Sequence, residues 1–337
     1  MNFNEFSRTY IIAEIGVNHE GDETLAAGMI EKAATAGADA VKFQTYRAEE
    51  YVSSEQPERL ERVGRWALSR DAFTRLAGVA KENGITFFST PLGIGDVAFL
   101  DGIAPMFKVA SGEITYLDMI REIAATGKPV ILSTGLADEE EIAAAVNCVL
   151  DARPNAQKDG TLMLMHCVSA YPTPPEDANI LNMRWLKERF GLPVGYSDHT
   201  LGIKACEIAV AAGAVAVEKH FTYRKENQKF RDHEISADPV DLAAMVAAIR
   251  EAEIYLGHAR RRRSAGENEG EEYMRRSLAA ARDIPAGAAI EAGWLTALRP
   301  AWGMGPNDGE KIIGKKLNRA RKAGEIIRAE DIEDCKD

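Results

Sequence analysis

Short apolar segments alternate with longer amphipathic segments over residues 1–257. The short segments are rich in β-branched residues, whereas apolar positions in the longer ones recur with helical spacing. The predicted strands are Ile11–Ile15, Ala40–Phe43, Thr86–Phe88, Met106–Val109, Val130–Leu132, Leu162–Met165, Val194–Tyr196 and Ala214–Val217. The predicted helices are Thr24–Ala36, Arg70–Lys81, Glu139–Leu150, Ile203–Ala212 and Pro239–Leu256. Strands and helices that alternate over about 250 residues predict an α/β protein with a (β/α)8 TIM barrel rather than an open sheet.

Polar residues stand at the end of each predicted strand. They are Glu14, Asn18, His19, Lys42, Gln44, Ser89, Thr90, Lys108, Ser111, Glu113, Ser133, Thr134, His166, Ser169, Tyr171, Ser197, Asp198, His199, Lys219 and His220. One polar strand end is common in a turn, but the carboxyl ends of all barrel strands meet on one rim, where active sites lie. The pattern therefore predicts a functional site on that rim.

The residue types suggest the chemistry of this site. His199 and His220, on adjacent strand ends, can present two neutral imidazoles to one divalent metal. Lysines beside serines are typical of a phosphate site, and the candidates are Lys42, Lys108, Ser111, Ser169 and Ser197. Glu14 and Glu113 are candidates for acid or base catalysis, and the alternative is that they only pair with the lysines.

Composition excludes several other classes of protein. With 337 residues, 46% of them hydrophobic, the chain can bury a large core. Its formal net charge of −11 argues against a nucleic-acid-binding protein, which needs a basic face. We expect no membrane span and a cytoplasmic protein, since no long apolar run or signal-like N-terminus is present. The cysteines share no metal-ligand spacing, so we expect reduced thiols.

The last third of the chain predicts a different organisation. Residues 258–275 hold a basic run, Arg260–Arg263, followed by an acidic one, which is typical of a solvated linker. "IPAGAAIEAGWL" from Ile284 and "RKAGEIIRAEDI" from Arg321 are half-repeats of a small β-rich domain. We therefore predict a barrel domain over 1–257, a linker over 258–275 and a β-rich domain over 276–337.

Seven motifs occur in the order of a known family. They are "AEIGVNHEGD" (13–22), "AVKFQT" (40–45), "FKVASGEI" (107–114), "ILSTG" (131–135), "HCVSAYPTPPED" (166–177), "GYSDHT" (195–200) and "EKHFT" (218–222). The chain resembles the sialic acid synthase family, which includes the N-acetylneuraminate, legionaminate and pseudaminate synthases. The half-repeats resemble the antifreeze-like (SAF) domain of these enzymes. The resemblance implies condensation of phosphoenolpyruvate with an N-acylated hexose, giving a 3-deoxy-2-ulosonic acid and phosphate.

The resemblance also implies roles for individual residues. His199 and His220 would hold a divalent ion, manganese or magnesium. The positions that match the phosphoenolpyruvate site are Lys42, Lys108, Ser111, Ser169 and Ser197. The positions that match the sugar site are Glu14, Gln44, Tyr171, Asp232 and Arg299. Catalytic roles fall to Glu14, Glu113 and Lys108. Arg299 would be delivered across the interface of a domain-swapped homodimer.

Two departures from the family pattern leave the acceptor sugar open. Phe230 and Arg231 stand where Gly-Pro is usual, and Ala301 with Trp302 replaces the usual turn after Arg299-Pro300. Three alternatives to the family function remain. They are an enzyme like 3-deoxy-octulosonate 8-phosphate synthase, a Schiff-base pyruvate aldolase, and an ice- or glycan-binding protein built on the C-terminal domain.

Overall fold

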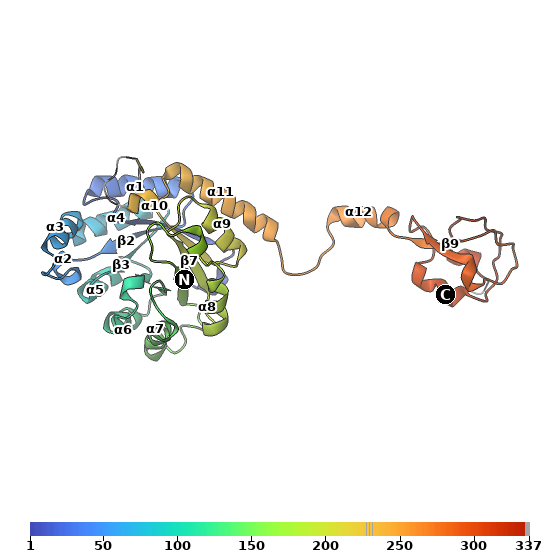
Figure 1. The fold of residues 1–337 in the computed structure, drawn as a ribbon, viewed down its shortest axis with the longest axis horizontal. Helices are drawn as coiled ribbons and strands as arrows, with labels where there is room; N and C mark the ends of the chain where they lie inside the picture. Colours follow the sequence, from blue (N-terminus) through green and yellow to red (C-terminus); the bar gives the residue numbers. More distant parts are fainter. Residues whose placement is uncertain (227, 229, 231, 334–337) are drawn as a thin grey trace. The chain divides into compact units, whose positions relative to one another are not determined.

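The computed structural model describes all residues except 227, 229, 231 and 334–337. The chain forms two compact units, Met1–Gly257 and His258–Asp337. Figure 1 shows the first unit in colours from blue to the light orange of α11, and the second in orange to red.

The first unit is a closed parallel barrel, as predicted. Its strands pair in sequence order, and β8 pairs with β1 to close the barrel. Among the described residues the strands are β1 (Tyr10–Gly16), β2 (Ala40–Thr45), β3 (Thr86–Pro91), β4 (Phe107–Val109), β5 (Val130–Ser133), β6 (Leu162–Cys167), β7 (Val194–Asp198) and β8 (Ala216–His220). Most strands run beyond their predicted ends, because the polar residues that follow each apolar run still belong to the strand.

Helices surround the strands of this unit (Figure 1). The α-helices are α1 (Glu23–Thr35), α2 (Ala48–Tyr51), α3 (Pro57–Trp66), α4 (Arg70–Glu82), α5 (Val97–Asp101), α6 (Leu117–Ala125), α7 (Glu139–Ala152), α8 (Asn182–Phe190), α9 (Lys204–Ala211), α10 (Asp232–Ile235) and α11 (Pro239–Leu256). The 3-10 helices are η1 (Phe3–Glu5), η2 (Ile94–Asp96), η3 (Ser111–Glu113) and η4 (Pro175–Asp177). All five predicted helices are present; those that were not predicted are mostly short.

The barrel interior has an apolar layer followed by a polar layer. The apolar layer is a separate buried cluster that includes Phe3, Ile12, Ala40, Phe88, Met106, Ile131, Met163 and Ala216. Side chains two positions apart point to the same face of a strand. On six of the strands the residue two positions beyond the apolar layer is polar: Glu14, Lys42, Thr90, Lys108, Ser133 and Glu218; on β6 it is Met165, which still belongs to the apolar cluster. The interior therefore becomes polar toward the carboxyl ends of the strands.

The second unit is small and rich in β-structure. It contains α12 (Ala265–Met274), the antiparallel pair β9 (Ser277–Ala280) and β10 (Leu295–Leu298), α13 (Gly309–Ile312), and the 3-10 helices η5 (Ala292–Trp294), η6 (Pro306–Asp308) and η7 (Ala329–Asp331). The half-repeats begin at Ile284 and Arg321, which pair in an antiparallel bridge. Gly287 and Gly324 have positive φ angles of 76° and 86°, a conformation that favours glycine at these equivalent turns.

A helix occupies much of the segment predicted as a linker. In α12, Ser264 and Glu267 form a capping box, and Arg261 pairs with Glu267 at 2.6 Å. No residue of α12 is buried, so its sequence carries no apolar periodicity. The helix depends on its cap and on side-chain ion pairs, which the hydrophobic pattern does not reveal.

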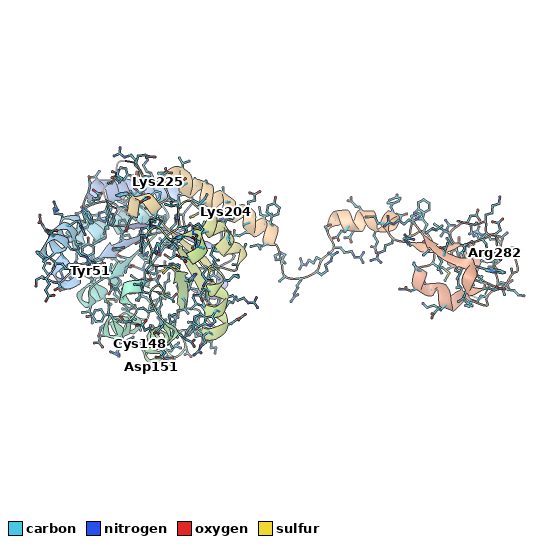
Figure 2. The ribbon with its side chains drawn as sticks, in the orientation of Figure 1. Tyr51, Cys148, Asp151, Lys204, Lys225 and Arg282 are labelled. Carbon is cyan, nitrogen blue, oxygen red and sulfur yellow. The ribbon has the colours of Figure 1, made fainter. Side chains whose placement is uncertain are left out.

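Two expectations from composition concern the described part of the chain. None of its helices is long and apolar enough to cross a membrane. Cys148, Cys167 and Cys206 are free thiols, and Cys335 lies outside the described residues. Cys148 lies on α7 at the periphery of the first unit, far from the barrel interior (Figure 2).

The second unit contains a buried carboxylate, and its replacement would test how much its ion pairs stabilise this unit. Asp331 accepts hydrogen bonds from Arg319 at 2.5 Å and from Arg321 at 2.6 Å, and its side chain is fully buried. Asp331→Asn should lower the free energy of unfolding of this unit by about 3 kcal/mol, because two guanidinium groups lose their partner. Thermal and urea unfolding of the full chain would measure the loss.

The same carboxylate predicts a pH dependence. Burial alone would raise the pKa of Asp331, but the backbone N–H of Arg328 and the two arginines outweigh burial and lower it below 3.8. The stabilisation is therefore present above the ordinary aspartate pKa and is lost as the pH falls below it. Asp308→Asn, at an exposed pair with Lys311, is the control and should have a much smaller effect. Equal effects of the two substitutions would contradict the prediction.

Candidate active site

Four charged side chains alternate in sign inside the polar layer. Lys42 Nζ lies 3.1 Å from Glu14 Oε2 and 3.5 Å from Glu218 Oε2. Lys108 Nζ donates to both carboxylate oxygens of Glu218, each at 2.8 Å. All four side chains are at most 5% exposed. The four groups neutralise one another when no ligand is bound.

Burial and the neighbouring charges shift the pKa values of the four groups in different directions. Burial raises the pKa of Glu14, and Lys42 only partly offsets this effect. Burial also lowers the pKa of Lys108, although Glu218 opposes the shift. For Lys42 the nearby Glu14 and Glu218 outweigh burial and raise the pKa. For Glu218 the two lysines outweigh burial and hold the pKa far below the usual range. Glu218 is thus the firmly ionised centre, and Glu14 takes up a proton most easily.

Sequence reasoning missed Glu218. Glu218 lies in β8 between Val217, which was assigned to a buried strand, and Lys219, which was assigned to the rim. The signal was the two-residue period of a strand. Because His220 faces the interior, Glu218 must face it too, and Lys219 between them must point outward.

Hydroxyl groups gather at the carboxyl ends of β4 to β7. Ser197 Oγ donates to Glu218 at 2.9 Å, and Ser111 Oγ accepts from the backbone N–H of Gly135 at 3.1 Å. A Cβ atom on Gly135 would lie 2.5 Å from Ser169 Oγ and 2.7 Å from Ser111 Oγ. Ser111 Oγ also lies 3.0 Å from the Cys167 thiol. The structure therefore brings Ser111 and Ser169 together around a glycine, as an oxyanion-binding group requires.

The two predicted metal ligands lie side by side. The rings of His199 and His220 have centroids 5.4 Å apart, so one ion can contact a nitrogen of each, since a metal–imidazole bond is about 2.1 Å long. His199 Nδ1 donates to the carbonyl oxygen of Val168 at 2.6 Å, which leaves Nε2 as the lone-pair nitrogen. Buried Nδ1 of His220 has no hydrogen-bond partner among the described residues.

The electrostatics of the two histidines suit a metal. Burial lowers the pKa of His199, and burial together with the neighbouring His199 lowers that of His220. Both rings are therefore neutral near pH 7, the form that binds cations. Within the described part of the chain, no cluster of three or more His, Cys, Asp or Glu residues is arranged to hold a metal. Two histidines alone would leave most coordination positions to water or substrate.

Residues predicted for the sugar side surround this histidine pair. The ring of Tyr171 lies 4.2 Å from that of His199. Burial raises the pKa of Tyr171, and Asp232 adds to the shift, which places this carboxylate within electrostatic range. Gln44 Nε2 donates to Glu14 Oε1 at 3.3 Å, so Gln44 connects to the charged groups. Tyr171 thus lies against the histidine pair, and Gln44 lies against Glu14, whose partner in the pairing of β1 with β8 is His220.

One departure from the family pattern lies in the loop after β8, two residues before Asp232. Phe230 packs against Trp66 at the end of α3, with ring centroids 4.8 Å apart, and also contacts His233. The loop after β8 and the loop after β2 therefore meet through two aromatic rings. Arg231 lies outside the described residues, so its place in the site stays a prediction.

Four other residues differ in their relation to the site. Glu113 ends η3, two residues after Ser111, and burial raises its pKa. Arg299 is exposed on the second unit, directly after β10. Lys219 and His166 were expected on the rim, but Lys219 bonds to Asp198 and His166 Nε2 bonds to the carbonyl of Ala178. Both point away from the interior because they have the opposite strand parity.

Comparisons with known proteins agree with this architecture. Residues 29–261 match the NeuB family, and residues 275–333 match the SAF domain. The N,N'-diacetyllegionaminic acid synthase of Campylobacter jejuni is 38% identical over 95% of this chain and 99% of the relative. A pseudaminic acid synthase of the same species is 33% identical over 98% of each chain.

A solved structure extends the agreement to three dimensions. The N-acetylneuraminic acid (sialic acid) synthetase of Leptospira borgpetersenii, crystallised with citrate, is 37% identical and superposes with a TM-score of 0.73. The match covers 78% of this chain and 90% of that chain. Fold and site together define a (β/α)8-barrel enzyme with an appended SAF domain. The chain belongs to the NeuB family.

The position of Glu218 predicts a large effect of one substitution. Glu218→Gln should lower the free energy of unfolding by about 3 kcal/mol, because two buried ammonium groups lose their shared carboxylate. Urea unfolding at neutral pH would measure the change. The control is Glu207→Gln, at an exposed pair with Lys204, which should unfold like the unsubstituted protein. A stability of Glu218→Gln equal to that of the control would show that the lysines do not depend on Glu218.

Proposed function

We propose that the protein condenses phosphoenolpyruvate with an N-acylated hexose, forming a nonulosonic acid of the 3-deoxy-2-ulosonic type and releasing phosphate. The observation that carries this proposal is that two buried lysines and two neutral histidines lie on the same rim of the barrel. The lysines suit a small, highly charged anion, and the histidines suit a cation that activates a second substrate. The relatives named above are synthases of such acids.

Phosphoenolpyruvate is assigned to the lysine side of the site. The ammonium groups of Lys42 and Lys108 would hold its charged groups, in place of part of their present pairing with Glu14 and Glu218. The hydroxyls of Ser111, Ser169 and Ser197 would donate to its oxygens. Glu218 keeps both ammonium groups at a fixed place in the barrel interior.

A divalent ion, manganese or magnesium, is assigned to His199 and His220. The neutral rings and the unpartnered Nδ1 of His220 fit a metal ligand set. The ion would supply Lewis acidity to the carbonyl oxygen of an open-chain aldehyde. Tyr171, Asp232 and Gln44 would orient the hydroxyl and N-acyl groups of the acceptor; the contact of Tyr171 with His199 and the hydrogen bond of Gln44 to Glu14 support this assignment.

Proton transfer in the reaction is assigned to the glutamates. C3 of the enol forms a bond to the aldehyde carbon, whose oxygen becomes a hydroxyl by taking a proton. Water adds at C2 and loses one proton, which restores the acid that protonated the aldehyde oxygen. The bond from C2 to the phosphate oxygen then breaks, the new C2 hydroxyl passes its proton to the departing phosphate, and the 2-keto acid remains. Glu14, whose pKa burial raises, would give the first proton, and Glu113 is the second acid or base candidate.

An assay of phosphate release tests this proposal. The protein should release phosphate from phosphoenolpyruvate only when an N-acylated hexose is present, and a panel of such sugars would identify the acceptor. Activity should vanish on treatment with a chelator and return with manganese. Phosphate release that needs no sugar, or full activity after chelation, would contradict the proposal. Trapping of pyruvate on a lysine by borohydride would instead identify a Schiff-base aldolase.

We further propose that the active enzyme is a domain-swapped homodimer in which Arg299 completes the sugar site of the other subunit. Arg299 is exposed, and its planar guanidinium suits hydrogen bonds of fixed direction. Residues 258–275 would tether the two domains. The support for this proposal is the match of the second unit to the SAF domain.

Mixing two inactive variants tests the exchange of Arg299. Arg299→Ala and His220→Ala should each be nearly inactive, because each lacks one part of every site. After subunit exchange, about a quarter of the sites should recover, since random pairing gives half heterodimers with one intact site each. Arg282→Ala, at another exposed arginine of the same unit, is the control and should stay active. Proven exchange without recovery would show that Arg299 acts in its own chain or not at all.

A further inference from the structure

Two charged residues next to the histidines point away from the active site. Asp198 and Lys219 lie directly opposite each other in the pairing of β7 with β8. Lys219 Nζ is 2.7 Å from Asp198 Oδ2, and the two side chains are 1% and 0% exposed. Strand parity directs both to the outer side of the barrel wall, so neither contacts a ligand in the interior.

Each atom of this ion pair has further partners. Lys219 Nζ also donates to the carbonyl oxygen of Thr200 at 2.6 Å. Asp198 Oδ1 accepts from the backbone N–H of Thr200 at 3.0 Å and from the Tyr196 hydroxyl at 3.2 Å. The Cys206 thiol on α9 donates to Asp198 Oδ2 at 3.4 Å. The pair therefore has hydrogen-bond partners in β7, the turn after β7 and α9.

Stability alone does not explain such a pair. Burying two charges costs about as much as their attraction returns, and apolar residues of similar volume often serve equally well. What the pair adds is a fixed geometry, because both partners adjoin the predicted metal ligands. Asp198 precedes His199, and Lys219 precedes His220.

Hydrogen bonds fix the turn that carries His199 at the residue before it and at the residue after it. The side chain of Asp198, before it, and the carbonyl of Thr200, after it, both bond to Lys219 Nζ. Lys219 is covalently joined to His220, so one ammonium group connects the backbones of both histidines. A shift of either strand end would have to break a buried, charged hydrogen bond.

We propose that Asp198 and Lys219 form a positioning pair that sets the separation of the His199 and His220 rings and thereby the affinity for the divalent ion. The inference rests on the proposed function, because the ion is part of it. Neither residue is catalytic, since both act only through the backbones of the histidines. Their contribution resembles that of outer groups that orient metal ligands, whose loss weakens metal binding about tenfold to a hundredfold.

A double substitution separates positioning from stability. Asp198→Asn together with Lys219→Met removes both charges, keeps an acceptor oxygen for the Thr200 N–H, and leaves no unpaired buried charge. The double variant should fold, with a circular dichroism spectrum like that of the unsubstituted protein. Its affinity for Mn²⁺ alone, measured from the electron paramagnetic resonance signal of the free ion, should fall at least about tenfold. Lys219→Met alone should be much less stable, because Asp198 stays buried and unpaired.

Val217→Ala is the matched control, because it should lower the stability of the protein and leave the Asp198–Lys219 ion pair intact. Val217 lies on the same face of β8, two residues before Lys219, and is fully buried. This variant should have a lower melting temperature and an unchanged affinity for Mn²⁺. A double variant that binds Mn²⁺ within twofold of the unsubstituted protein would overturn the inference and leave the proposed function intact. An unsubstituted protein that binds no Mn²⁺ would overturn both the metal assignment and the inference.

Discussion

A closed barrel of parallel strands admits side chains of only one parity to its interior, and the site depends on this constraint. The residues that fill the apolar layer and the residues that carry the charges stand two positions apart on the same strands, as Ile12 and Glu14 do on β1 and Ala216 and Glu218 do on β8. The apolar layer closes the amino-terminal end of the barrel and excludes water from beneath the charges. The polar layer is therefore held in a rigid, dry setting by the same strands that form the core.

Burial at this depth requires that each charge has a partner, which shapes the resting site. Lys42 and Lys108 could not remain ionised in the interior without Glu14 and Glu218, because isolated buried charges shift their pKa and become neutral. The two carboxylates thus favour the charged form of both lysines. The pKa values of Glu14 and Glu218 shift in opposite directions, because Glu218 is paired with both lysines whereas burial outweighs the single pairing of Glu14 with Lys42.

Much of the first unit could be predicted from the sequence, because hydrophobic period and chain order determine a parallel barrel and its rim. The order of strands and the proximity of His199 to His220 follow from that geometry alone. Glu218 was missed because it interrupts an apolar run that suggested a uniformly buried strand. The helix Ala265–Met274 was missed because none of its residues is buried, although Ser264 and Glu267 have the residue types and the spacing of a capping box. The barrel pattern does not predict the place of Arg299, because this residue belongs to the second unit and is exposed there.

Strands β7 and β8 have different functions on their two faces. On the inner face, Glu218 contributes a charge and His220 a ring nitrogen without a hydrogen-bond partner among the described residues. On the outer face, Lys219 joins the turn after β7 through Asp198 and Thr200. The inner residues need a defined spacing, and they cannot bond to each other to achieve it without losing their freedom to bind ligands. The outer face has no ligand to bind, so its residues can form a buried ion pair there, and the proposed role of that pair is to fix the two strand ends that carry the histidines.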